Sequence, residues 1–131
     1  MAPHALAQWR EIAHSHDATA LDALLAEDVV FLSPVVFRPQ IGKAITKSYL
    51  AAAVEVLGNE TFRFTDEWVG ENSGVLEFVA TLDGVEINGV DIIAWNEAGQ
   101  IVSFKVMVRP LKGANTLREK MAAQLEKASG W

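Results

Sequence analysis

The apolar residues change their spacing near Gly58, and this change constrains the fold more than any other feature of the sequence. Before it, apolar side chains recur every three or four residues, as in "LAQWREIA" and "KAITKSYLAAAVEVLG", which is typical of amphipathic helices. After it, they alternate with polar residues, as in "TFRFTDEWVG" and "GVLEFVATLDG", which is typical of half-buried strands. Helices followed by an antiparallel sheet predict an α+β fold.

Three helices are predicted before this change, each with one apolar side. The first carries Leu6, Trp9, Ile12 and Ala13 at helical spacing, and Pro3 suits its first turn. The second follows Asp17, a good N-cap residue, and presents three leucines, Leu21, Leu24 and Leu25. The third ends at Gly58 and is predicted to face the core with Ile45, Tyr49, Ala52, Ala53 and Val56.

The predicted strands also divide into faces. A short strand, "VVFLS", is stopped by Pro34. In the later strand "TFRFTDEWVG", alternation places three aromatic residues on one side: Phe62, Phe64 and Trp68. "DIIAWNEAGQIVSFKVMVRP" predicts two strands joined by a turn at Asn96–Gly99. In the second of these, alternation puts Val102, Phe104, Val106 and Val108 on one face and Ile101 and Met107 on the other. Leu117, Met121 and Leu125 then predict a C-terminal helix.

Length and composition exclude several classes of protein. A chain of 131 residues, half of them hydrophobic, predicts one globular domain spanning residues 1–131. The sequence has no cysteine and a net charge of −6, so disulfides and thiol catalysis are excluded, and a nucleic-acid partner is not expected. No apolar stretch is long enough for a bilayer, and the polar residues in "MAPHALAQWREIAHSHD" do not suit a signal peptide. We therefore expect a cytoplasmic protein without a membrane partner.

An aspartate interrupts the most apolar predicted strand. In "NGVDIIAW", Asp91 lies among residues suited to a covered sheet. A carboxylate in such a place must point to water, find a partner, or line a cavity. The sequence pattern alone leaves these three possibilities open.

Three stretches resemble a known family in their order and spacing: "LLAEDVVFLSPV", "FRPQIGKAITKSYL" and "GVDIIAWNEAGQIVSFKVM". They are similar to the nuclear transport factor 2-like proteins of the SnoaL-like group, which includes ketosteroid isomerases. The resemblance covers roughly residues 5–110. It implies a cone-shaped barrel: a curved antiparallel or mixed sheet wrapped by the three N-terminal helices, with the C-terminal helix in addition, around a deep apolar pocket.

The resemblance carries the catalytic residues of the isomerases over unevenly. Asp91 matches their pocket acid, whereas Ser33 stands at the position of their aspartate base and Trp9 at that of their tyrosine donor. A serine does not take up a proton at neutral pH unless another group activates it. Asp91 and Ser33 remain the catalytic candidates. The alternatives are a structural acid bonded to backbone amides near Asn88, a serine that bonds the turn at Pro34, and a tryptophan that only packs in the core.

The implied function is binding of a hydrophobic small molecule that carries a polar group, such as a steroid-, polyketide- or terpenoid-like compound. The alternative is an isomerase, cyclase or dehydratase that uses Asp91 as its acid or base. The residues expected to bind the ligand are Trp9, Phe31, Tyr49, Phe62, Phe64, Trp68, Phe78, Asn88, Ile93, Phe104 and Val106.

Metals, cofactors and oligomers can also be considered from the sequence. His14 and His16 lack the spacing of a helical metal pair, and phosphate-loop and zinc-protease motifs are missing, so we predict no metal and no cofactor. Because the hairpin strands are apolar on both faces and one layer of helices covers only one of them, we expect a homodimer through the outer face of the sheet.

Overall fold

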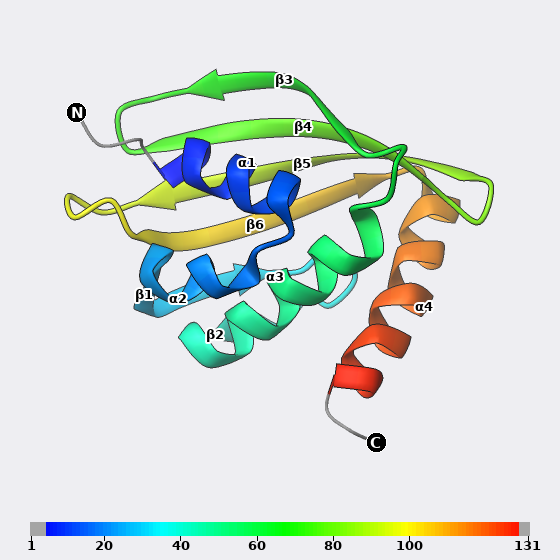
Figure 1. Cartoon of the computed structure of the whole chain (residues 1–131), viewed down its shortest axis with the longest axis horizontal. Helices are drawn as coiled ribbons and strands as arrows, with labels where there is room; N and C mark the ends of the chain where they lie inside the picture. Colours follow the sequence, from blue (N-terminus) through cyan, green and yellow to red (C-terminus); the bar gives the residue numbers. More distant parts are fainter. Residues whose placement is uncertain (1–4, 129–131) are drawn as a thin grey trace.

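A curved sheet of six strands is the framework of the fold (Figure 1), which a computed structural model describes for residues 5–128. Its strands are β1 (Leu25–Leu32), β2 (Gln40–Ile41), β3 (Arg63–Val69), β4 (Ser73–Leu82), β5 (Val85–Trp95) and β6 (Ile101–Arg109). They lie in the order β2-β1-β6-β5-β4-β3. Only β1 and β6 are parallel, and the other neighbours are antiparallel. The predicted α+β class and curved mixed sheet are confirmed, but the sheet is open and not a closed barrel.

Four α-helices accompany the sheet in the described part of the chain: α1 (Ala5–Ser15), α2 (Leu21–Leu24), α3 (Lys43–Leu57) and α4 (Leu111–Ala128). The Pro3 assigned to the first turn of the first helix lies outside the described residues. Asp17 acts as an N-cap, as predicted, because its side chain accepts a hydrogen bond from the Thr19 amide. The second helix is shorter than predicted, since Leu25 is already extended and pairs with Ile101 of β6.

The helices α1, α3 and α4 lie on the same side of the sheet, where α3 and α4 run beside each other (Figure 1). On β4 this inner face carries the predicted alternation, with Leu76, Phe78, Ala80 and Leu82 buried. On β5 the residues opposite them in register also turn inward, so the side chain of Asp91, which pairs with Leu76, points toward the helices. The core therefore fills the space between the sheet and one layer of helices.

The buried side of α3 differs from the prediction by one residue. The structure buries Thr46, Leu50, Ala52, Val54 and Leu57, whereas Ile45 is 38% exposed. Successive helical residues are about 100° apart around the axis, so a shift of one position turns a different stripe toward the sheet. Ala52 is buried as predicted, and Tyr49 and Val56 are partly buried against the core.

Two irregularities in the sheet reverse the predicted faces of two strands. In β3, Phe64 pairs with Phe78 but Asp66 pairs with Glu77, so one residue is inserted. In β6, Phe104 pairs with Ile93 but Ile101 pairs with Trp95. A one-residue bulge moves every following side chain to the opposite face. Strict alternation across these bulges was therefore wrong: the predicted inner side of β3 is lost after Phe64, and Ile101 is fully buried in the core.

The outer face of the sheet carries apolar residues that no described helix covers. Val75 on β4 lies opposite Ile92 on β5, and Val90 lies opposite Met107 on β6. Met107 is 54% exposed, and Trp68 at the β3 edge is 53% exposed. Glu77 and Lys105 lie on the same face, opposite Val90 and Ile92, so the apolar residues form patches between charged ones. Exposed apolar patches often mark a surface of protein interaction.

We propose that a second copy of the chain covers this face. Met107→Glu should then give a monomer, because two buried carboxylates without partners would oppose association, while the protomer keeps its fold since Met107 is already half exposed. Sedimentation velocity at micromolar concentration measures this, with Ile45→Glu on the helical side as the control. A monomer in the unaltered protein would contradict the proposal.

Candidate functional site

A cavity lies between the inner face of the sheet and the helices α1, α3 and α4. The centre of a water molecule can occupy about 70 Å³ of it. It separates two buried clusters, one around Trp9, Phe31 and Phe104 and the other around Leu57, Phe78 and Leu117. Its aromatic wall consists of Trp9, Phe31, Tyr49, Phe62, Phe78 and Phe104. The lining is therefore almost entirely apolar.

Asp91 is the only carboxylic acid that lines this cavity among the described residues. It is 6% exposed. The indole Nε1–H of Trp9 donates a hydrogen bond to its Oδ2 at 3.0 Å, and the other carboxyl oxygen has no hydrogen-bond partner within residues 5–128. Of the three possibilities that the sequence left open, Asp91 therefore combines two: it has a partner, and it lines a cavity.

The surroundings of Asp91 favour its neutral form. Burial raises the pKa of Asp91 from its ordinary value of 3.8 to about 7, and the hydrogen bond from Trp9, which stabilises the charged form, opposes this rise less strongly. No lysine, arginine or histidine among the described residues lines the cavity to compensate a negative charge. At neutral pH this carboxyl is close to half protonated, so it can either donate or accept a hydrogen bond.

Ring packing fixes the position of Trp9. Its ring meets Phe104 edge-on at 4.9 Å between centroids. Phe104 lies 6.1 Å from Phe31, and Phe31 stacks on Tyr49 at 5.4 Å. The four rings come from α1, β6, β1 and α3 respectively, so one continuous aromatic contact joins the helices to the sheet. Tyr49 also lines the cavity, and its hydroxyl forms no hydrogen bond with another described residue.

Ser33 lines the same cavity, but its oxygen is already engaged. Its Oγ accepts hydrogen bonds from the amides of Val35 and Val36 at 3.1 and 3.3 Å. These bonds stabilise the turn after Pro34, as in the structural alternative for this residue. Because both lone pairs are occupied and no histidine or lysine among the described residues lines the cavity, Ser33 has no activating base except Asp91 itself.

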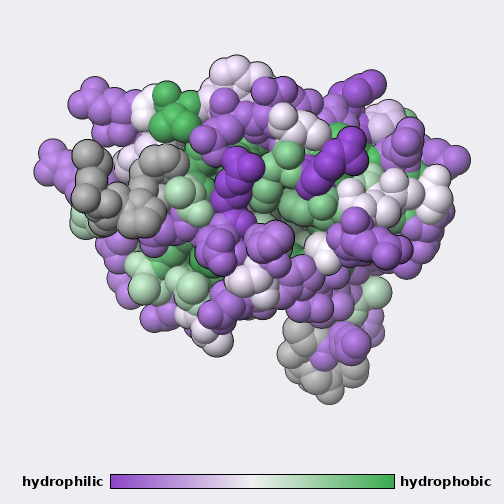
Figure 2. Space-filling model, turned by 45° about the horizontal axis from the view of Figure 1, so that its top comes forward, coloured by the Kyte–Doolittle hydropathy of each residue, from purple (hydrophilic) through white to green (hydrophobic). Residues whose placement is uncertain are grey.

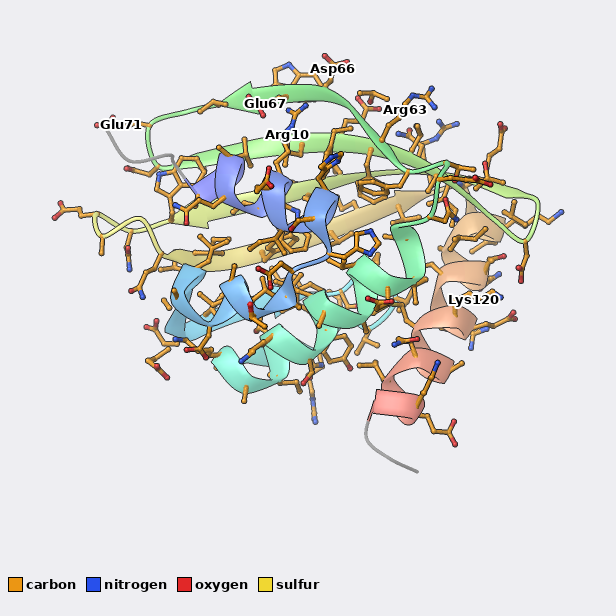
Figure 3. The ribbon with its side chains drawn as sticks, viewed as in Figure 1. Arg10, Arg63, Asp66, Glu67, Glu71 and Lys120 are labelled. Carbon is orange, nitrogen blue, oxygen red and sulfur yellow. The ribbon has the colours of Figure 1, made fainter. Side chains whose placement is uncertain are left out.

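The surface above α1 is closed by polar side chains. Arg10 on α1 and Glu67 on β3 reach toward each other (Figure 3) and form an ion pair at 2.9 Å. The Arg10 guanidinium also lies over the ring of Phe64 at 5.5 Å. Hydrophilic side chains cover most of the surface on this side, with apolar residues in smaller patches between them (Figure 2). Exposed pairs of this kind add little stability.

Four residues expected to bind a ligand do not line the cavity. Phe64 lies under Arg10 and packs on Phe62 instead, and the bulge in β3 turns Trp68 to the outer face. Asn88 also points outward, where it donates to Glu77 and to the Phe78 carbonyl. Ile93 is on the inner face but is fully buried among core side chains. The prediction that these four residues bind a ligand in this cavity therefore does not agree with the structure.

Sequence reasoning missed part of the cavity lining, which also includes Ala13, Pro34, Val35, Leu50, Ala53, Val54, Leu57, Gly58, Leu117 and Met121. The spacing of Leu50, Val54 and Leu57 on α3 was a usable signal, because it forms an apolar stripe of its own. Leu117 and Met121 were recognised only as one side of a helix. Their place in the cavity depends on how α4 docks, which spacing does not reveal.

One glycine shapes the wall of the cavity. A Cβ at Gly89 on β5 would lie 2.5 Å from the Phe78 ring and 2.8 Å from the Met107 carbonyl oxygen. The missing side chain therefore lets the Phe78 ring lie against the strand two residues from Asp91. Phe78 stacks in turn on Phe62 at 5.6 Å.

Within residues 5–128 no group of three or more His, Asp or Glu side chains is arranged to hold a metal ion. His14 and His16 are both exposed and lie outside the cavity. No helix in the same range is long and apolar enough to cross a membrane.

The fold and cavity define a class of small α+β proteins in which helices close an apolar space over a curved sheet. The model of the SnoaL-like domain family matches residues 6–104, so the chain belongs to this family. It has the nuclear transport factor 2-like fold. None of the curated proteins compared with the chain matches it significantly.

Solved structures agree with this family. The chain is similar to a steroid delta-isomerase from Pseudomonas aeruginosa, with 32% identity over 97% of this chain and 93% of the other, and a TM-score of 0.90. It is similar to a protein with a cystatin-like fold from Silicibacter pomeroyi DSS-3, with 32% identity over 92% and 84% of the two chains and a TM-score of 0.84. The epoxide hydrolase/cyclase-like enzyme SalBIII, which has a role in pyran ring formation in salinomycin, shares 18% identity over 80% and 88%, with a TM-score of 0.65. This last likeness concerns the fold alone.

The raised pKa of Asp91 predicts a pH-dependent stability. The folded state holds a proton on this carboxyl up to about pH 7, whereas the unfolded chain releases it near pH 4. The unfolding free energy should therefore fall between these two pH values, by roughly 4 kcal/mol at most. Asp91→Asn removes this titration. The unfolding free energy of the variant minus that of the unaltered protein should therefore be larger at pH 8 than at pH 5.

Urea unfolding of both proteins at the two pH values measures this difference. An equal loss of roughly 1–3 kcal/mol at both pH values would instead identify Asp91 as a structural acid whose bonds an amide cannot replace.

Proposed function

We propose that the protein binds a small, largely apolar molecule in this cavity and that Asp91 holds the polar group of the ligand. The observation that carries the proposal is a carboxyl with one oxygen bonded to Trp9 and the other without a partner, inside an otherwise apolar space. Binding sites for small molecules commonly combine an apolar wall with a few convergent polar groups. The Tyr49 hydroxyl is the second such group.

The arrangement at Asp91 suits a ligand that accepts a hydrogen bond. In the acid form, Oδ2 accepts from Trp9, so the proton belongs on the other oxygen, which can donate it to a ligand carbonyl. In the carboxylate form this donor is lost, and a carbonyl would face a negative charge. Affinity for a ketone should therefore fall as the pH rises through the pKa of Asp91, about 7.

Cyclohexenone, a ketone that accepts but cannot donate hydrogen bonds, is a suitable probe. It should shift the Trp9 Nε1–H resonance in a ¹H–¹⁵N NMR spectrum at pH 5.5 and bind roughly thirtyfold more weakly at pH 8.5. Trp9→Phe assigns the resonance, and Asp91→Asn should remove the pH dependence. If the affinity were the same at both pH values, Asp91 would not be the group that meets the ligand.

A proton-transfer enzyme is the second candidate function. Two observations favour it: a carboxyl whose pKa lies near neutral pH, which suits general acid–base catalysis, and the 32% identity to a steroid delta-isomerase. Against the isomerase reaction stands Ser33, whose oxygen is bonded to the turn. Trp9 bonds Asp91 and is a weaker donor for a substrate oxygen than a tyrosine would be.

We expect no useful isomerisation of a β,γ-unsaturated ketosteroid by the unaltered protein. Base catalysis contributes about 10²–10⁴-fold, and Ser33 does not supply it. If the cavity admits the steroid, the double variant Ser33→Asp, Trp9→Tyr should raise the rate. Ultraviolet absorbance of the conjugated product measures the rate, with each single variant as a control. Robust turnover by the unaltered protein would show that another group acts as the base.

A further inference from the structure

The far end of the cavity is closed by a helix that is firmly docked. Leu117 and Met121 of α4 both line the cavity, and Leu117 is 3% exposed. Lys120 on the same helix forms an ion pair at 2.8 Å with Asp83, in the turn between β4 and β5. At the start of α4, a Cβ on Gly113 would lie 3.1 Å from Ile87 of β5, so the helix approaches the sheet closely there. The burial of Leu117 and the close approach at Gly113 hold this part of α4 against the sheet, whereas the exposed ion pair adds little.

The space that remains is small. Each water molecule needs about 10–15 Å³ of such space, so the 70 Å³ cavity accommodates roughly five to seven waters. Since a water occupies about 30 Å³ of liquid, the corresponding molecule has a liquid volume of roughly 150–210 Å³. One six-membered ring with a carbonyl group fills this volume, whereas two fused rings exceed it and four rings exceed it about two- to threefold.

The polar and apolar ends of the cavity give this ring an orientation. Trp9, which bonds Asp91, belongs to the cluster under α1, whereas Leu117 belongs to the cluster under α4 and Met121 packs against it. Phe62 and Val106 contact both clusters and lie between them. A ring whose oxygen meets Asp91 therefore points its opposite edge at the two α4 side chains.

We propose that the ligand is a single-ring ketone and that Leu117 and Met121 set this size limit. The inference rests on the proposed binding function and adds the chemical class of the ligand. It separates this chain from a protein that takes a four-ring steroid. Met121 is the informative position because it is only partly buried, so shortening it costs less stability than removing the buried Leu117 side chain.

Three enones with the same cyclohexenone ring test the limit: cyclohexenone, the two-ring octalone and the four-ring androst-4-en-3-one (androstenone below). Binding is followed at the Trp9 Nε1–H resonance at pH 5.5 in the full chain. The unaltered protein should bind cyclohexenone at least roughly tenfold more tightly than either larger enone. Met121→Ala should raise the affinity for octalone by roughly tenfold relative to cyclohexenone. Leu125→Ala, one turn further along α4 and outside the cavity, should leave the ratio of the octalone affinity to the cyclohexenone affinity unchanged.

The outcomes separate the two proposals. If androstenone or octalone bound the unaltered protein as tightly as cyclohexenone, the size limit would be overturned while ligand binding at Asp91 would stand. If Met121→Ala and Leu125→Ala changed the octalone ratio equally, or neither changed it, Met121 would not set the limit. If none of the enones shifted the Trp9 resonance, the binding function itself would fail, and the size limit with it.

Discussion

The hydrogen bond from Trp9 to Asp91 is the interaction on which the arrangement of the cavity depends. It crosses from α1 to the middle of β5 and is made in a space with almost no other polar groups. Its strength comes from this apolar setting, because the local dielectric constant is low. The same setting disfavours the charge on Asp91. The burial of Asp91 therefore has two consequences: its carboxyl anchors α1, and the pKa of this carboxyl is raised.

The aromatic contacts make this hydrogen bond geometrically specific. Phe104 packs edge-on against the Trp9 ring, so the indole cannot turn away from the strand without losing that contact. Gly89, two residues before Asp91, leaves space for the Phe78 ring beside the strand. A side chain at Gly89 would displace the Phe78 ring from this wall of the cavity. Large and rigid aromatic rings line the cavity and belong to both buried clusters. Because such rings do not collapse onto each other, a space remains beside Asp91.

The fold could be predicted from the sequence because periodicity reports which side of an element is apolar. The alternation in β4 and the turn at Asn96–Gly99 needed no tertiary information. The errors arose where one residue changes the phase. The insertion after Phe64 in β3 turned Trp68 outward, and the corresponding irregularity in β6 turned Ile101 inward. A bulge depends on the pairing of two strands, and the pattern of a single strand does not contain it. Asp91 could be singled out because a carboxylate in an apolar strand is visible in that strand alone. The contribution of Met121 could not, because it depends on how α4 docks.

Ser33 is the main difference between this cavity and the site pattern of the ketosteroid isomerases, which have an aspartate at this position. An aspartate at this position would place a second carboxyl in the cavity, and the two acids would compete for protons. Serine leaves Asp91 as the single carboxylic acid that lines it in the described chain, while its own oxygen stabilises the turn through the amides of Val35 and Val36. One acid with a pKa near neutrality can bind a carbonyl and exchange its proton, but it cannot both remove a proton from carbon and stabilise the oxyanion that results. Chemistry in this cavity would therefore need a single transfer at one place, or a second group such as the Tyr49 hydroxyl, whereas binding needs only what the cavity already contains.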